Sequence, residues 1–293
     1  MIHLQGTGTA IVTPFKEGGE VDEEGLRSLV TFQEENGVDF IVPVGTTGES
    51  ATLSHTEHLK VIKIVVDQAK RAKVVAGAGS NSTSEAIHLS KGARDLGVSA
   101  ILSISPYYNK PTQKGLIKHY EAITKAVDAP FIVYNVPGRT GSNINPSTVL
   151  KLAENPNIIG VKEASGNMSQ IMAILERAPK GFSVVSGDDA LTFPIMALGG
   201  RGVISVASNV APSQVSSMVR DALDGRWEES RKQHFRLLPL FTNLFLETNP
   251  IPVKTGLRMM GMPAGVFRLP LCEMEPSNQE VLRKTLADLG LLK

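Results

Sequence analysis

The sequence lacks several features that would define particular classes of protein. It holds a single cysteine, Cys272, so no disulfide can form within the chain. No apolar stretch approaches the roughly 18 residues that a membrane-spanning helix needs, and residues 1–15 lack the pattern of a secretory signal. Basic and acidic side chains balance at 30 against 29, which argues against nucleic acid or an anionic membrane as a partner. These absences predict a cytoplasmic protein without membrane or nucleic-acid partners.

What the sequence does contain is a regular alternation of short apolar runs and longer helical patterns. The eight runs rich in strand-forming residues are Thr9–Val12, Phe40–Val44, Val74–Ala78, Ala100–Ile104, Phe131–Asn135, Ile158–Lys162, Ser183–Ser186 and Gly202–Val206. Their starts lie roughly 20 to 34 residues apart, which suits one βα unit each. The first run leads into Thr13-Pro14-Phe15 and not into a glycine-rich dinucleotide turn. The pattern therefore predicts an α/β fold, a closed (β/α)8 TIM barrel.

The C-terminal part of the chain predicts further helices. A helix near Pro212–Leu223 would complete the eighth unit, and others are expected near Trp227–Leu246, Ile251–Met260 and Asn278–Leu291. No proline- or serine-rich linker separates them from the barrel. We therefore expect a catalytic barrel over residues 1–224 and a C-terminal helical extension over residues 225–293.

Helix starts are indicated at three places. Ser54 with Glu57, and Ser82 with Glu85, have the spacing of a capping box. The pair Asn145-Pro146 is typical of an N-cap followed by proline at the first helical position.

Strand parity singles out Lys162. Active sites of such barrels lie at the carboxyl ends of the strands, and side chains alternate between the two faces of a strand. If Ile158, Gly160 and Lys162 face inward, the lysine tops the barrel, Gly160 leaves space beneath it, and Glu163 points away. An exposed lysine costs about 4.6 kcal/mol to deprotonate at pH 7, and burial removes much of that cost, which a Schiff-base nucleophile requires. The alternative is a strand-end lysine that reaches solvent.

Two neighbouring strands support a reactive site. On the fifth strand, Tyr134 is expected one strand away from Lys162 at the same height, where a phenol can move protons. Its alternative role is that of a core aromatic. The second strand ends in two threonines between glycines, Thr46 and Thr47, whose hydroxyls and backbone N–H groups suit a small carboxylate.

Two other groups of residues argue against a phosphorylated substrate and against a bound metal ion. Asp188 and Asp189 follow the seventh strand and disfavour a phosphorylated substrate, although they also suit the start of the next helix. His55 and His58 lie three residues apart, but no His-Glu-x-x-His pattern and no third ligand accompany them. A surface pair is favoured over a metal site.

Taken together, these residues closely resemble the dihydrodipicolinate synthase family of the bacterial lysine pathway, within the N-acetylneuraminate lyase superfamily. The resemblance runs from about Gly6 to the C-terminus. The matching segments are AIVTPF (10–15), VGTTGESATL (44–53), SPYYNKPTQ (105–113), YNVPGRTG (134–141), GVKEASGN (160–167), SGDD (186–189), GVISV (202–206) and NPIPVK (249–254).

The resemblance implies a role for each matching residue. Lys162 would form a Schiff base with pyruvate, and Tyr134, Thr46 and Tyr108 would form a proton relay, with Tyr108 entering from a neighbouring subunit. Thr47 would hold the pyruvate carboxylate, and Arg139 the carboxylate of the aldehyde. Gly187 and Ile204 would line the pocket. No metal and no organic cofactor would be needed.

The resemblance also implies a regulatory site where L-lysine inhibits some family members. The positions that correspond to it are Ser50, Ala51, His55, His58, Asn81, Glu85 and Tyr107. This assignment gives the two histidines a role other than metal binding or solvent exposure.

The implied reaction is the condensation of pyruvate with L-aspartate 4-semialdehyde, which leads towards lysine and diaminopimelate. The implied assembly is a homotetramer built as a dimer of dimers. Three alternatives remain at this stage. The first is another pyruvate-dependent class I aldolase, such as a keto-deoxy sugar acid aldolase or an N-acetylneuraminate lyase. The others are a non-catalytic barrel and a metal-dependent hydrolase.

Overall fold

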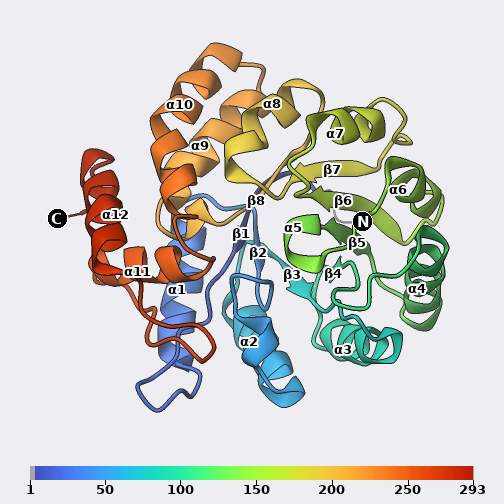
Figure 1. Ribbon diagram of the computed structural model, residues 1–293, viewed down its shortest axis with the longest axis horizontal. Coiled ribbons are helices and arrows are strands. Elements are labelled where there is room, and N and C mark those ends of the chain that lie inside the picture. The colour runs from blue at the N-terminus through green and yellow to red at the C-terminus, as the bar shows by residue number, and fades with distance from the viewer. Residues whose placement is uncertain (1–3, 293) are drawn as a thin grey trace.

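A computed structural model describes residues 4–292 and places eight parallel strands in a closed barrel (Figure 1). The strands are β1 (Gly6–Ala10), β2 (Phe40–Val42), β3 (Lys73–Gly77), β4 (Ala100–Ile104), β5 (Phe131–Asn135), β6 (Ile158–Glu163), β7 (Ser183–Ser186) and β8 (Gly202–Ser205). They follow one another around the barrel in chain order, and β8 pairs with β1 to close it. The predicted (β/α)8 fold class is confirmed.

Helices surround the barrel and connect its strands. The α-helices of the barrel are α1 (Glu23–Glu35), α2 (His55–Gln68), α3 (Thr83–Asp95), α4 (Gln113–Ala126), α5 (Pro137–Thr140), α6 (Pro146–Leu152), α7 (Met168–Leu175), α8 (Thr192–Ala197) and α9 (Pro212–Leu223). Three short 3-10 helices accompany them: η1 (Ser50–Thr52), η2 (Asp189–Leu191) and η3 (Ala207–Asn209). The C-terminal part forms α10 (Trp227–Asn243), α11 (Ile251–Met259) and α12 (Pro276–Asp288). These last three lie together beside α1 and α9 (Figure 1).

The first strand begins earlier than the sequence pattern suggested. It spans Gly6–Ala10 and not Thr9–Val12. Glycine and threonine alternate in its first half, so the strand lacks the apolar run by which its neighbours were predicted. The glycines are needed inside the barrel, because a Cβ at Gly8 would lie 2.0 Å from the ring of Phe40. β2 and β8 end two and one residues earlier than predicted, and β6 runs one residue further.

The predicted helix starts met different outcomes. The capping box before α2 is confirmed, with both hydrogen bonds between Ser54 and Glu57 present. The one before α3 is wrong, because Ser82 makes no capping hydrogen bond and Glu85 instead bonds to Ser80 and His55. Proline occupies the first turn of α6 as expected, but the Asn145 side chain makes no capping bond there.

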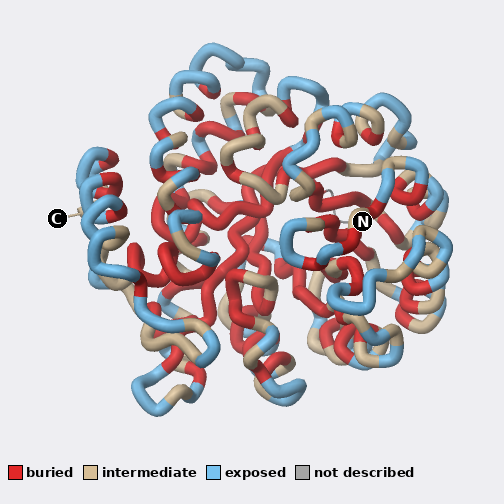
Figure 2. Tube along the Cα trace, in the orientation of Figure 1, coloured by how far each residue is buried: buried red, intermediate tan, exposed pale blue. Residues whose placement is uncertain are grey.

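The apolar side chains form one core inside the barrel and others between the barrel and its helices. Figure 2 shows the strands almost wholly buried, whereas the outer helices are exposed on their far faces. Phe40, Val42, Leu102, Ile132 and Ile204 are among the buried residues that fill the barrel interior. This filled interior leaves the strand ends as the place for a cavity.

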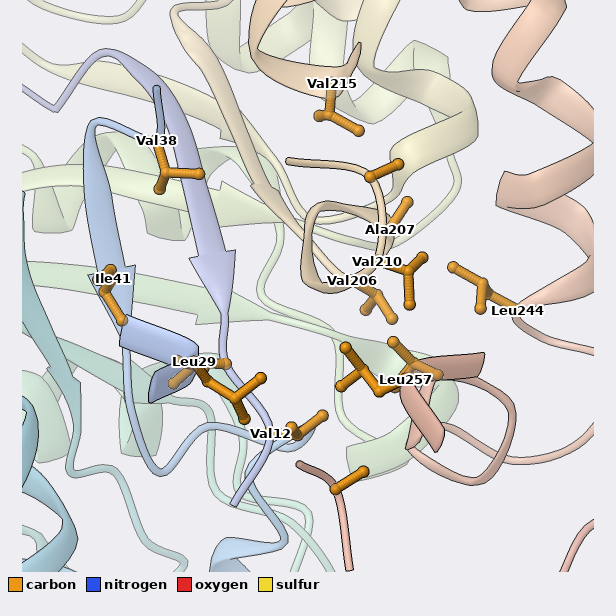
Figure 3. Close-up of a cluster of buried hydrophobic side chains, with 14 of the residues drawn as sticks. Val12, Leu29, Val38, Ile41, Val206, Ala207, Val210, Val215, Leu244 and Leu257 are labelled. Carbon is orange, nitrogen blue, oxygen red and sulfur yellow. The ribbon is translucent and has the colours of Figure 1, made fainter. Parts of the chain in front are cut away.

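The C-terminal helices share a core with residues that follow the first and last strands. Val12, Val206, Leu244 and Leu257 belong to one buried cluster, drawn in Figure 3, to which residues of α10 and α11 contribute. The division at residues 224 and 225 stays a prediction, and its outer limits, residues 1–3 and 293, lie outside the described residues. Within residues 4–292, no helix is long and apolar enough to cross a membrane.

Candidate active site

A cavity of about 420 Å³ lies at the carboxyl ends of the barrel strands. Its wall includes Ala10 at the end of β1, Val42 at the end of β2, Tyr134 of β5 and Lys162 of β6. The loops and helices above contribute Gly45, Thr46, Thr47, Val136, Arg139, Ala164, Gly187, Asp188, Val206, Phe241, Thr242, Phe245 and Asn249. Leu102 of β4 lines it as well, so residues far apart in the sequence meet where barrel enzymes carry out their chemistry.

Lys162 faces the interior of the barrel, as strand parity predicted. It is the direct register partner of Tyr134, and its Nζ lies 4.3 Å from the centre of the Tyr134 ring. Only 5% of the residue is exposed. Burial lowers the pKa of Lys162 to about 7, with a smaller contribution from the positive charge of Arg139 and an opposing one from Asp189. This lowered pKa favours the neutral amine, the state that attacks a carbonyl.

Glu163, the next residue, faces the other side of the strand. Its carboxylate accepts hydrogen bonds from the side chain of Asn135, the backbone N–H of Ser165 and the side chain of Gln170. It therefore does not pair with Lys162, which confirms the predicted parity. The space beneath Lys162 at Gly160 is filled, because a Cβ there would lie 2.5 Å from the carbonyl oxygen of Ser183 and 3.1 Å from Leu4.

Tyr134 presents a neutral phenol to the same cavity. Burial raises its pKa, while the positive charge of Arg139 and a hydrogen bond with the Thr46 side chain act in the opposite direction. A phenol that stays protonated at neutral pH can donate a proton and recover it within one reaction cycle. The amine and the proton carrier therefore lie side by side.

The β2–α2 loop brings Thr46 and Thr47 to the cavity. The loop turns tightly, with backbone hydrogen bonds from Gly48 to Gly45 and from Glu49 to Thr46, each 3.1 Å. The Thr47 hydroxyl accepts a hydrogen bond of 3.0 Å from the Asn249 side chain. Successive backbone N–H groups in such a turn form a concave site for an anion.

Arg139, from the short helix α5, also reaches the cavity. Its guanidinium donates to the backbone carbonyl of Asn249 over 3.2 Å. A fixed guanidinium suits a carboxylate ligand. Gly187 lines the wall beside Lys162, and a Cβ there would lie 2.8 Å from Lys162 Cε. A side chain at this position would therefore displace the lysine.

Two predicted residues do not line the cavity. Ile204 is fully buried in the barrel core and forms part of its packing. Tyr108 is 89% exposed and adopts a left-handed backbone conformation with φ 68°. The structure therefore does not bring Tyr108 to Lys162 within one chain.

The residues expected to form a regulatory site gather around a second cavity of about 410 Å³. Ser50, Ala51, His55, His58, Glu85 and Tyr107 line it, whereas Asn81 does not. His55 Nε2 lies 2.6 Å from Glu85, and His58 Nε2 lies 2.7 Å from the Gly77 carbonyl oxygen. Hydrogen bonding from Ser80 lowers the pKa of Glu85, burial opposes that shift, and His55 adds to it. The second cavity thus presents an anionic carboxylate.

The two cavities are neighbours. Thr46, Arg139 and Asn249 line both of them. A small cavity of about 40 Å³ lies between them, lined by residues that include His58 and Tyr134. Among residues 4–292, no group of three or more His, Cys, Asp or Glu side chains is placed to hold a metal ion.

Several cavity residues were missed by the sequence reasoning. Asn249 stands in the string NPIPVK, to which the resemblance assigns no role. Phe241 and Phe245 come from α10 and the turn after it, whose helical pattern gives no indication of a place above the barrel. Asp188 lines the cavity and also caps η2, as its alternative interpretation proposed. Asp189 is buried and accepts from the backbone N–H groups of Val206 and Ala207.

A buried lysine with a lowered pKa, beside a buried phenol at the carboxyl end of a (β/α)8 barrel, defines the class of Schiff-base-forming barrel lyases. The dihydrodipicolinate synthetase family matches residues 3–289, and the chain belongs to this family.

Individual relatives agree with the family assignment. The chain is 53% identical over 291 residues to the 4-hydroxy-tetrahydrodipicolinate synthase of Methanocaldococcus jannaschii, covering 99% of this chain and 100% of the relative. It is 44% identical to a crystal structure of the enzyme from Cyanidioschyzon merolae with lysine bound, at a TM-score of 0.97 and covering all of both chains. The same identity and TM-score hold for the Acinetobacter baumannii enzyme complexed with pyruvate, over 99% of this chain and 100% of the other.

Proposed function

We propose that this protein condenses pyruvate with L-aspartate 4-semialdehyde to 4-hydroxy-tetrahydrodipicolinate, through a Schiff base at Lys162. The family to which the chain belongs and its relatives carry this activity in their names. The single observation that supports the role of Lys162 is its buried amine, with a pKa of about 7, beside Tyr134 in a cavity.

The first half of the reaction joins pyruvate to the enzyme. The neutral amine of Lys162 attacks the keto carbon, and the carbinolamine loses water to give an iminium ion. Tyr134 gives the proton that the departing hydroxyl needs, and Thr46 holds the phenol in place. Thr47 and the backbone N–H groups of its turn hold the pyruvate carboxylate.

The second half forms the new carbon–carbon bond. Loss of a methyl proton turns the iminium into an enamine, whose carbon attacks the aldehyde carbon, and the resulting alkoxide takes up a proton. The amino group of the second substrate then attacks the iminium carbon, closes the ring and expels the Lys162 amine. Arg139 binds the carboxylate of this substrate, and Gly187 leaves room for it.

The exposed Tyr108 supports an assembly in which subunits complete each other's sites. A tyrosine with 89% of its surface exposed is unusual for a single chain and suits a place at a subunit contact. We propose that Tyr108 joins Tyr134 and Thr46 of a neighbouring copy as the last member of the proton relay. The assembly would be a homotetramer built as a dimer of dimers, and the site of action the cytoplasm.

The second cavity is proposed to bind L-lysine as an inhibitor. Glu85, with its lowered pKa, would hold an ammonium group, and Ser50, His55 and Tyr107 offer further polar contacts. The residues shared with the active-site cavity, Thr46, Arg139 and Asn249, provide the route by which binding affects catalysis. Asn81 does not line this cavity, and its backbone carbonyl accepts a hydrogen bond from Asn109.

Reduction with borohydride in the presence of pyruvate tests the nucleophile. The expected result is a covalent mass increase on the peptide that contains Lys162, and none in Lys162→Ala. Absence of the adduct in folded protein would disprove the Schiff base.

A coupled assay with L-aspartate 4-semialdehyde, run beside cleavage of keto-deoxy sugar acids and N-acetylneuraminate, tests the second substrate. Faster turnover of a sugar acid would contradict the proposed aldehyde, and loss of activity in EDTA would favour the hydrolase alternative.

A further inference from the structure

A second buried lysine, Lys254, lies in α11 away from the reacting atoms. Its Nζ donates to Glu49 over 2.6 Å, and the side chains of both residues have no exposed surface. The same nitrogen donates to the carbonyl oxygen of Val266 over 2.7 Å. It also lies 4.7 Å from the ring centre of Phe15 and 5.0 Å from that of Phe267. The ammonium group of Lys254 therefore contacts a carboxylate, a carbonyl oxygen and two aromatic rings.

Such a pair is a poor way to gain stability. Burial of two ions costs several kcal/mol for each, which the mutual attraction often fails to recover in full, and apolar pairs of similar volume are frequently as stable. A directional ion pair does fix the relative position of the two segments that carry it. The question is therefore which segments Glu49 and Lys254 hold together.

Glu49 ends the turn that carries Thr46 and Thr47. This turn begins and ends in residues with left-handed backbone conformations, since φ is 50° at Val44 and 53° at Glu49. Such conformations cost on the order of 1–3 kcal/mol each in residues other than glycine and persist only where the surroundings impose them. At Gly48 a Cβ would lie 3.1 Å from the backbone nitrogen of Val44, so the turn is also tightly folded upon itself.

The other side of the pair is a rigid support. Lys254 stands on α11 one turn before Leu257, which is fully buried in the core cluster of Figure 3. Asn249, just before the same helix, holds the Thr47 hydroxyl. The segment from residue 249 to residue 254 therefore contacts the turn twice, once at Thr47 and once at Glu49.

We propose that Glu49 and Lys254 are positioning residues, which hold the turn of Thr46 and Thr47 in the conformation that receives the pyruvate carboxylate. Neither residue lines the cavity around Lys162. This inference rests on the proposed function, because it assumes that Thr47 and its turn bind pyruvate. Loss of the ion pair frees the strained turn and weakens pyruvate binding, while the amine of Lys162 stays in place.

The test compares Glu49→Gln and Lys254→Met with the wild type and with Lys63→Met. Lys63 forms an ion pair of 2.7 Å with Asp67 on the exposed face of α2, so its variant controls for the loss of a lysine charge. Pyruvate is titrated under borohydride, and the trapped fraction at Lys162 is measured by mass spectrometry, with folding checked by circular dichroism. The pyruvate concentration for half-maximal trapping should rise about tenfold or more in the first two variants. The maximal trapped fraction should match that of the wild type and of Lys63→Met.

A double variant, Glu49→Leu with Lys254→Met, separates positioning from stability. Removal of both charges leaves no unpaired buried ion, so its thermal stability should recover towards that of the wild type. A raised half-saturation concentration in this folded protein supports the proposal, and a return to the wild-type value overturns it. The proposal is also overturned if folded Glu49→Gln has the same half-saturation concentration of pyruvate as the wild type, or if all three variants fail to fold. If pyruvate cannot be trapped on Lys162 of the wild type, the proposed function itself is contradicted.

Discussion

The side-chain amide of Asn249 donates a 3.0 Å hydrogen bond to the Thr47 hydroxyl, across 202 residues of sequence. The backbone carbonyl of the same asparagine accepts from Arg139. One residue therefore fixes the groups that we propose for both substrate carboxylates, Thr47 for pyruvate and Arg139 for the aldehyde.

Asn249→Ala should weaken pyruvate binding, because the Thr47 hydroxyl loses its only side-chain donor among the described hydrogen bonds. We expect the KM for pyruvate to rise about tenfold, which corresponds to about 1.4 kcal/mol. Asn155→Ala is the matched control, since Asn155 makes a similar bond of 2.9 Å to Thr124, and neither residue lines the cavity. Equal KM values in the two variants would contradict the proposed role of Asn249.

Tyr134→Phe removes the proton carrier and keeps the ring beside Lys162. The rate constant kcat should fall by about 10²- to 10⁴-fold, the range that general acid–base groups contribute. Steady-state kinetics measures this loss. Tyr120→Phe is the control, because the Tyr120 phenol is also buried but bonds to the carbonyl oxygen of Ser103 in the core. A fall of less than tenfold for Tyr134→Phe would exclude proton transfer by this residue.

The pH dependence of Schiff-base formation should follow the pKa of Lys162, about 7. The attacking amine must be neutral, so the rate at fixed pyruvate should rise as pH increases from 6 to 8 and then level off. An ordinary lysine would give a rate that still rises above pH 9. Stopped-flow mixing with borohydride quenching at a series of pH values provides the measurement, and a midpoint above 9 would refute the lowered pKa.

Glu85→Gln should reduce inhibition by L-lysine, because a neutral amide binds an ammonium group more weakly than a carboxylate. We expect the half-inhibitory concentration of L-lysine to rise about tenfold, with each variant compared with its own uninhibited rate. Glu228→Gln is the control, since Glu228 pairs with Arg231 on the exposed face of α10. Unchanged inhibition in Glu85→Gln, or no inhibition of the wild type, would exclude the second cavity as a lysine site.

Tyr108→Phe and Lys162→Ala should each be nearly inactive, yet a mixture of the two should regain activity. In a mixed dimer, one site combines Lys162 of the first chain with Tyr108 of the second, whereas the other site lacks both groups. We expect up to about half the wild-type rate per mixed dimer after joint unfolding and refolding. If mixing restores nothing although size-exclusion chromatography shows mixed oligomers, Tyr108 does not act across subunits.

Strand periodicity explains why the reactive pair could be predicted from the sequence. Side chains alternate strictly along a strand, so the choice of one inward residue on β6 places Lys162 inside and Glu163 outside. The pairing of parallel neighbours then sets Tyr134 beside Lys162, as observed. These inferences need only local sequence and the rule that barrel sites lie at strand ends.

Contacts between distant segments could not be predicted in this way. The bond between Asn249 and Thr47 depends on how α10 and α11 fold back towards the barrel mouth, which no local pattern encodes. The capping box predicted for Ser82 and Glu85 was wrong for a related reason. Glu85 has partners on α2 and before α3 that the spacing alone does not reveal. The roles of Tyr108 and Ile204 came from resemblance alone and stay predictions.

Gly187 limits the positions at which substitutions can reshape the cavity of this enzyme. The position tolerates no side chain beside Lys162, so the floor of the cavity is fixed by backbone and by the nucleophile itself. Phe241 and Phe245, by contrast, belong to α10 and its following turn and contribute no reacting atom. Libraries aimed at longer or bulkier aldehydes should therefore vary these two phenylalanines and leave the seventh strand and its loop untouched.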